Sequence, residues 1–248
     1  MAVTRVTTRS RCAAWLWCLL PAVPAAQAAG GLNINATRVV VTQAEGGTRL
    51  ITGNSSDIPY LMNIRFSATP DGKGSAPFLA SPPVYRLEAG GSNVVKIMAG
   101  DTRMLPRDRE SVFYLSANGI PRSNPLTRDG SGFVGGGLSY AVGNQIKLFY
   151  RPTGLPGTAK AAISGLKLNR VAEGVRVSNP SAYHVTLASL RLGGQSVTFN
   201  ATQPAMLAPF GSATYRVHGA YPISAAGKAE WKAINDSGAQ VRGEGVIQ

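Results

Sequence analysis

Residues 146–157 read IKLFYRPTGLPG, and this stretch decides how the chain is organised. The segment 146–150 is short and apolar with one Lys inside it, a composition that favours a β-strand. The segment 151–157 that follows is rich in Pro and Gly, which predicts a linker. The stretch therefore ends one group of elements and begins another.

Short strand-like segments repeat on both sides of this linker. They are rich in β-branched and aromatic residues, Gly, Pro, Asn and Asp separate them, and no long segment has a helical period. The pattern predicts an all-β protein made of two immunoglobulin-like sandwiches. The strands expected before the linker are residues 35–42, 48–53, 60–67, 93–98, 111–116, 138–142 and 146–150. Those expected after it are residues 165–169, 175–178, 184–192, 195–200, 214–218, 229–235 and 241–247.

The N-terminus has the three parts of a secretory signal peptide. Arg5, Arg9 and Arg11 precede a short apolar segment, residues 12–20, and the small residues AQA at 26–28 form a cleavage site. Cleavage is expected after residue 28. The chain is accordingly divided into a signal peptide (1–28), an N-terminal domain (29–152), a linker (153–157) and a C-terminal domain (158–248).

Composition and charge exclude several classes of protein. Hydrophobic residues make up 44% of the chain, which is enough for folded cores. The net charge of +13 suits an anionic partner, but the basic residues are not clustered with aromatic ones as in nucleic-acid-binding proteins. Both cysteines, Cys12 and Cys18, lie within the signal peptide, so the secreted product is expected to form no disulfide bond. No other apolar segment approaches the roughly 20 residues of a membrane-spanning helix.

Catalytic and cofactor sites are not indicated. The sequence lacks a G-x-S-x-G motif, and its two histidines, His184 and His218, are too isolated to form a zinc or copper site. Gly227 and Lys228 lack the rest of a phosphate-binding loop, so ATP is not expected to bind. We therefore expect no enzyme activity, no cofactor and no metal.

Two charged residues interrupt expected strands. Arg38 lies within residues 35–42, and Lys147 lies within residues 146–150. A charge at a sheet position costs desolvation energy unless it is exposed or paired. On spacing alone, the two side chains are either solvated on the outer faces of the sheets or form a cationic anchor for a carboxylate in the angle between the domains.

A distinctive set of segments occurs in order along the chain: residues 37–40 (TRVV), 59–61 (PYL), 77–88 (PFLASPPVYRLE), 105–115 (LPRDRESVFYL), 120–121 (IP), 146–152 (IKLFYRP), 179–186 (NPSAYHVT), 206–210 (MLAPF) and 234–238 (INDSG). In these segments the sequence resembles the periplasmic chaperones of the chaperone–usher pilus pathway, the PapD-like family. The resemblance runs through nearly the whole chain after residue 28 and implies two immunoglobulin-like domains arranged in an L shape.

This resemblance implies a binding site for a pilin subunit. Arg38 and Lys147 are similar to the family's cleft pair, which binds the C-terminal carboxylate of the subunit. Leu138, Tyr140 and Val142 are similar to its donor-strand residues, whose side chains fill the open core of an immature subunit. The same exposed strand would also allow the chaperone to associate with itself.

The resemblance also implies an ionic network between the domains and a cellular role. Lys96, Glu110 and Asp236 are expected to form the network, with Lys96 where the family commonly has Arg. The implied role is a periplasmic chaperone that folds and caps pilin or fimbrial subunits and delivers them to an outer-membrane usher without ATP. The alternative is a secreted two-domain adhesion or pilus-structural protein with the same sandwich fold.

Overall fold

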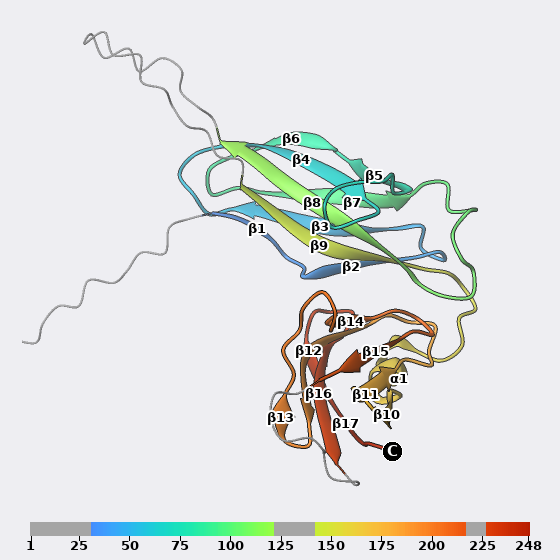
Figure 1. Ribbon diagram of the computed structural model, residues 1–248. Coiled ribbons are helices and arrows are strands. Elements are labelled where there is room, and N and C mark those ends of the chain that lie inside the picture. Colours follow the sequence, from blue (N-terminus) through green and yellow to red (C-terminus); the bar gives the residue numbers. More distant parts are fainter. Residues whose placement is uncertain (1–30, 122–141, 217–226) are drawn as a thin grey trace, which may run out of the picture.

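The computed structural model describes residues 31–121, 142–216 and 227–248, and the chain forms two β-sandwich domains arranged in an L shape (Figure 1). The all-β prediction of two immunoglobulin-like sandwiches is confirmed. The proposed signal peptide, residues 1–28, lies outside the described residues. No helix in the described part of the chain is long and apolar enough to cross a membrane.

The N-terminal domain consists of two sheets. One sheet has the strand order β1-β3-β7-β5 and the other β2-β9-β8-β4-β6. Every strand pair is antiparallel except β2 with β9, which is parallel. The strands are β1 (Leu32–Ile34), β2 (Arg38–Thr42), β3 (Gly47–Asn54), β4 (Tyr60–Ser67), β5 (Phe78–Ser81), β6 (Val84–Leu87), β7 (Ser92–Ala99), β8 (Ser111–Pro121) and β9 (Val142–Arg151).

The C-terminal domain is a second, smaller sandwich with one short helix. Its sheets have the orders β10-β11-β15 and β13-β12-β16-β17, and β14 pairs with β12. The helix begins after Thr158, whose side chain accepts a hydrogen bond from the Ala161 N–H. The elements are α1 (Ala159–Ser164), β10 (Lys167–Val171), β11 (Gly174–Ser178), β12 (Val185–Leu192), β13 (Gln195–Ser196), β14 (Met206–Leu207), β15 (Ser212–Tyr215), β16 (Lys228–Ile234) and β17 (Gln240–Val246).

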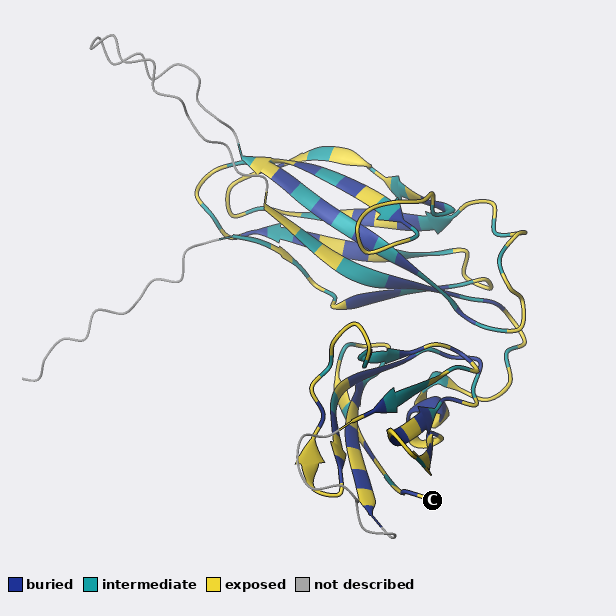
Figure 2. Ribbon diagram, viewed as in Figure 1, coloured by how far each residue is buried: buried dark blue, intermediate teal, exposed yellow. Residues whose placement is uncertain are grey.

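Each domain has its own core. Alternate residues of the strands point between the sheets, as Phe113, Leu115 and Ala117 do in β8. The cluster of the C-terminal domain surrounds Trp231, whose indole N–H donates to the Ile163 carbonyl oxygen at 2.8 Å. Buried residues accordingly lie within each sandwich and exposed ones on its outside (Figure 2). The two separate clusters indicate that the domains meet through surface contacts and not through a shared core.

The first two strands belong to different sheets, and this positions the functional site. β1 pairs with β3, whereas β2 pairs with β9 in the opposite sheet. The sequence predicted one strand over residues 35–42, but the observed strand begins at Arg38. β2 covers only the second half of β9, from Lys147 to Arg151. Within the described residues, the first half of β9 forms a ladder with β8 alone. Its other edge has no ladder partner there, and the Asn144 side chain donates to the Leu32 carbonyl oxygen of β1 at 3.4 Å.

Candidate functional site

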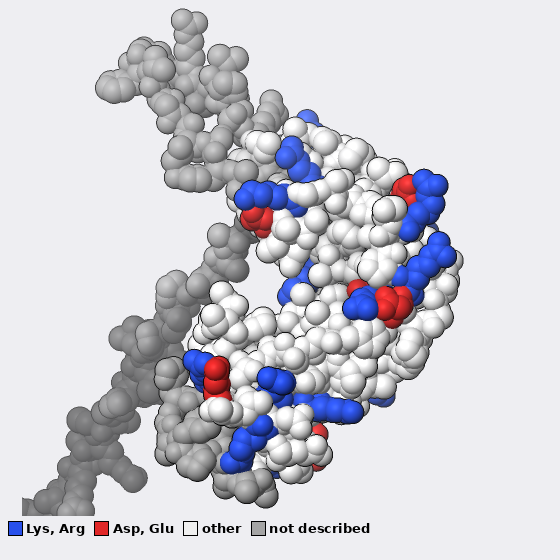
Figure 3. Space-filling model, turned by 45° about the vertical axis from the view of Figure 1, so that its right-hand side comes forward, with Lys and Arg blue, Asp and Glu red and all other residues white. Residues whose placement is uncertain are grey.

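Arg38 and Lys147 face each other across the parallel pair of β2 and β9. They are direct register partners, so their side chains lie on the same face of the sheet. This face is turned toward the C-terminal domain. Figure 3 shows a hollow between the two domains, with Lys or Arg side chains at its inner end. The structure thus brings together the two charges that the sequence singled out.

The guanidinium of Arg38 is held by both domains. The side chain is buried, its Cζ lies 5.4 Å from the centre of the Phe149 ring, and its Nη1 donates to the Ile234 carbonyl oxygen at 2.9 Å. Burial lowers the pKa of Arg38, and the negative charges of Asp236 and Glu110 act in the opposite direction. Its Nε is buried without a hydrogen-bond partner among the described residues. The contacts fix the guanidinium in place but leave part of its donor capacity unused.

Lys147 is half-buried, and its ammonium group has no hydrogen bond or ion pair to any described residue. Burial lowers the pKa of its ammonium group, and the positive charge of Arg38 lowers it further. A cation in such an environment is destabilised unless an anion neutralises it. A guanidinium and an ammonium on the same sheet face have the charge and the donors that suit binding of a carboxylate.

A cleft of about 540 Å³ lies beside Arg38. It is lined by residues of both domains, and both polar and aliphatic side chains contribute. Its lining residues are Arg38, Ala159, Lys160, Ile163, His184, Ile234, Asn235, Asp236, Ser237 and Val241.

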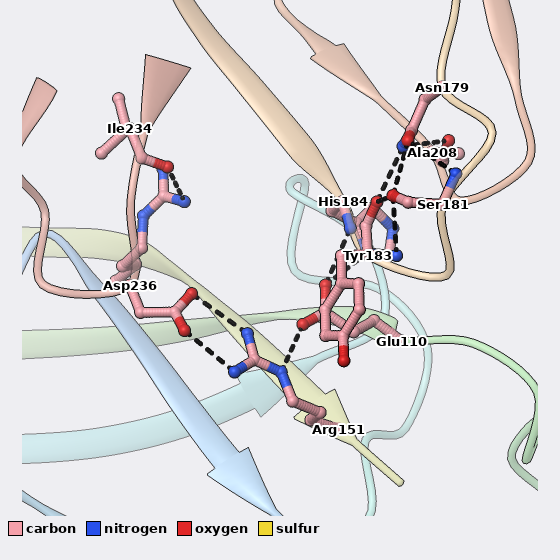
Figure 4. Close-up of polar contacts among 10 residues, drawn as sticks. Glu110, Arg151, Asn179, Ser181, Tyr183, His184, Ala208, Ile234 and Asp236 are labelled. Carbon is pink, nitrogen blue, oxygen red and sulfur yellow. Dashed lines mark hydrogen bonds and ion pairs between the residues drawn. The ribbon is translucent and has the colours of Figure 1, made fainter. Parts of the chain in front are cut away.

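Arg151 connects the domains by ion pairs on both sides of its guanidinium (Figure 4). Its Nε donates to Glu110 Oε1 at 2.8 Å, and Nη1 and Nη2 donate to the two carboxylate oxygens of Asp236 at 2.9 and 3.0 Å. Its Cζ also lies 5.1 Å from the centre of the Tyr183 ring. Burial opposes the charge of Arg151, but the hydrogen bonds and charges of Asp236 and Glu110 outweigh it and raise its pKa. Glu110 and Asp236 therefore lie in one ionic network with Arg151.

The assignment of Lys96 to this network is wrong. Lys96 lies on β7, in the sheet opposite the one that carries β8 and β9, and it is exposed beside Arg49 and Ser81. No ion pair joins it to a described residue. Arg151 occupies the central position instead, so the bidentate Arg geometry is present and not lost. The end of β9 is next to both Glu110 and the turn after β16, whereas β7 is separated from them by the N-terminal core.

Three further contacts hold the domains together near the cleft. Glu110 is buried and also accepts a hydrogen bond from the backbone N–H of His184 at 2.8 Å, while its own N–H donates to the Ala182 carbonyl oxygen at 2.9 Å. On the other side, Gly238 in the turn between β16 and β17 contacts Thr37 and has a φ of +85°. A side chain at Gly238 would be strained and would collide with Thr37. Sequence reasoning missed this contact, because it joins residues of different domains.

The donor-strand prediction is only partly covered by the described residues. Leu138 and Tyr140 lie outside them, and Val142 is the first residue of β9. Val142 is 45% exposed although it is apolar. It begins the half of β9 whose outer edge is open. This is the geometry that an added strand requires.

Comparison with known proteins gives the same class of protein that the fold and cleft define. A family model described as "Pili and flagellar-assembly chaperone, PapD N-terminal domain" matches residues 31–156, and "Pili assembly chaperone PapD, C-terminal domain" matches residues 161–245. The chain is 33% identical over 213 residues to the probable fimbrial chaperone protein ElfD of Escherichia coli K12, covering 85% of this chain and 84% of ElfD. It is also 33% identical over 225 residues to the chaperone protein FimB/FhaD of Bordetella pertussis, and the match covers 87% of this chain and 86% of FimB/FhaD.

Solved structures agree with these sequence relatives. The YadV chaperone has a TM-score of 0.72 at 30% identity, and the match covers 87% of this chain and 98% of YadV. The SafB chaperone of Salmonella enterica, solved in complex with the SafA pilin, has a TM-score of 0.72 at 26% identity, covering 89% and 98%. The chain belongs to the PapD family of pilus-assembly chaperones.

Proposed function

We propose that this chaperone captures pilin or fimbrial subunits by binding their C-terminal carboxylate between Arg38 and Lys147. The observation that carries the proposal is the pairing of two partly buried cations on one sheet face, of which Lys147 has no neutralising partner among the described residues. A bound carboxylate restores the charge balance of both groups. The SafB chaperone has been solved in complex with the SafA pilin, which supports a pilin subunit as the partner.

The open edge of β9 supports the second half of the proposal, donor-strand complementation. A subunit strand can pair with the N-terminal part of β9, since β2 covers only residues 147–151. Val142 alternates with Leu138 and Tyr140, so the three side chains would enter successive positions of the subunit core. The carboxylate anchor would set the register of this pairing. Self-association of the free chaperone would use the same edge.

The remaining parts of the proposal concern location and organisation. We assign residues 1–28 to a cleaved signal peptide, which would place the chaperone in the periplasm, and 153–157 to the linker between domains 29–152 and 158–248. The end of β9 at Arg151 and the cap of α1 at Thr158 support these limits. Delivery to an outer-membrane usher, without ATP hydrolysis or other catalysis, completes the proposed role. No group of three or more His, Cys, Asp or Glu residues in the described part of the chain could hold a metal ion.

The test is co-purification of the tagged chaperone from the periplasm of cells that express fimbrial subunits. The wild type should retain a small β-rich partner, and the Arg38→Ala, Lys147→Ala double variant should lose it while remaining folded. The matched control is the Arg49→Ala, Lys167→Ala variant, which removes one Arg and one Lys that are exposed outside the cleft. If the cleft variant retains the partner as well as the control does, the assignment of the carboxylate site is wrong.

A further inference from the structure

Phe210 has an unusual backbone conformation. Its φ is +56°, and it is the only residue other than glycine with a positive φ in the described ranges. A bulky aromatic residue is sterically disfavoured in this left-handed region, whereas glycine adopts it freely. Such strain persists only where the surrounding structure enforces it, and it is concentrated at functional positions.

Hydrogen bonds on both sides of Phe210 enforce this conformation. The Phe210 N–H donates to the Ser181 carbonyl oxygen at 3.1 Å, and the Gly211 N–H donates to the Ala208 carbonyl oxygen at 3.1 Å. Asn179 donates its backbone N–H to the Gly211 carbonyl oxygen at 2.8 Å and its side-chain amide to the Ala208 carbonyl oxygen at 3.0 Å. Figure 4 shows Asn179, Ser181 and Ala208 in this arrangement. The turn between β14 and β15 is thereby fixed to residues 179–181.

The strained turn presents the Phe210 ring to the other domain. The Cζ atom of Arg109, in the loop before β8, lies 5.0 Å from the centre of the ring. This is the geometry of a cation–π contact. Arg109 also forms two hydrogen bonds to Asp108, at 3.0 and 2.6 Å, but Asp108 belongs to the same loop. Asp108 therefore orients the guanidinium, and Phe210 is the partner that joins it to the C-terminal domain.

The contact between Arg109 and Phe210 lies next to the ionic network and joins the same two domains. Arg109 immediately precedes Glu110, whose N–H donates to the Ala182 carbonyl oxygen. Residues 109–110 thus dock on residues 179–184 and on the turn at Phe210, while Arg151 and Asp236 join the domains from the end of β9. Both contacts fix the position of the C-terminal domain, whose Ile234 carbonyl oxygen holds Arg38.

We propose that Arg109 and Phe210 form a second interdomain clamp, which positions the C-terminal domain so that the cleft has the width needed for the end of a subunit. The two side chains act as positioning residues, because their contact with each other sets how the domains lie. A cation–π contact at a partly exposed site changes an equilibrium by about 2- to 5-fold, which is the size of effect expected here for the clamped population. Because Phe210 is 49% exposed, its removal leaves the core of its domain intact.

The test measures the interdomain distance directly. The chain has no cysteine after Cys18, so Asp57→Cys and Gln195→Cys place one spin label on each domain at exposed positions. Pulsed electron resonance on the free chaperone should give a narrow distance distribution for the wild type and for Phe210→Trp, which keeps a ring. Two single variants should broaden this distance distribution: Phe210→Gly, which removes the ring and the strain, and Arg109→Gln. The variant that combines both changes should give a distribution no broader than that of either single variant. Asp108→Asn is the control for effects that pass through Asp108.

Subunit capture by the same variants provides the second measurement, and this part rests on the proposed function. Phe210→Gly and Arg109→Gln should weaken subunit binding by about 2- to 5-fold, with recovery in Phe210→Trp. Unchanged distance distributions in both variants would overturn the clamp, and broadened distributions with unchanged subunit affinity would overturn its positioning role. If the wild type captures no subunit at all, the proposed function fails, while the distance measurement still decides whether the clamp exists.

Discussion

Replacing Arg151 by Met should uncouple the two domains. Arg151→Met keeps a side chain of similar length but removes the cation from between Glu110 and Asp236. The Glu110 side chain is only 2% exposed, so its carboxylate would keep just the backbone N–H of His184 as a strong donor. Breaking one partner of a buried ion pair costs about 3–5 kcal/mol. The Asp236 side chain is 47% exposed, so losing its ion pair with Arg151 adds no more than about 1 kcal/mol to the cost.

The carboxylate of Glu110 can recover water if the domains separate, so the cost should appear as a loss of interdomain coupling. Urea unfolding is suited to this test, because Trp231 is the only tryptophan after residue 28 and reports on the C-terminal domain. In the wild type its fluorescence and the far-ultraviolet circular dichroism should change together, and in Arg151→Met the two curves should separate and shift to lower urea. The matched control is Arg151→Met with Glu110→Gln, which removes both charges and should recover about 2 kcal/mol or more. The reasoning would be refuted if Arg151→Met unfolded in a single transition with a free energy of unfolding within about 1 kcal/mol of the wild-type value.

Three further predictions concern the cleft and the open edge. Burial and the charge of Arg38 lower the pKa of Lys147, and a bound carboxylate favours the charged ammonium. Subunit affinity should therefore fall as pH rises through that lowered pKa, and Lys147→Arg should remove the fall. Titrations from neutral pH up to the ordinary lysine pKa of about 10.4 can show this. Val142→Asp should weaken subunit binding by about tenfold or more in a pull-down or titration without unfolding the chaperone, whereas Val94→Asp, a similarly exposed Val in the opposite sheet, should not. Equal effects of the two Asp variants would count against the donor-strand assignment. Gly238→Ala should destabilise the interdomain contact by about 1–2 kcal/mol, measured by urea unfolding, because its φ is +85° and a Cβ would meet Thr37; a stability equal to the wild type would contradict that contact.

Sequence patterns predicted most strands but not all of them. β3, β4, β7, β8, β12, β16 and β17 carry alternating apolar residues and were located to within a few residues, with β8 extending further than expected. β5 and β6 were missed because each has only four residues and the Pro82-Pro83 pair separates them. The six-residue helix α1 was also missed, since so short a helix has no period to detect.

The candidate site was predicted to a similar degree. Arg38 and Lys147 stood out because a charge within an apolar strand needs an explanation, and the register of β2 with β9 makes them neighbours. Glu110 and Asp236 were assigned from resemblance and do share one network. Nothing in the sequence singles out Arg151, because it ends its strand beside a Pro, where a charged residue is unremarkable, and the resemblance points to Lys96 instead.

The sequence by itself determined the fold class, the division into two domains and the presence of unusual charges in two strands. These features follow from residues that are close in the chain, through alternation, turn residues and local composition. The tertiary structure decided which charge lies in which network, because contacts such as Arg151 with Asp236, Arg109 with Phe210 and Thr37 with Gly238 join residues from different domains. Their formation depends on the angle between two sandwiches, and that angle is set by many weak contacts acting together and not by any local sequence pattern.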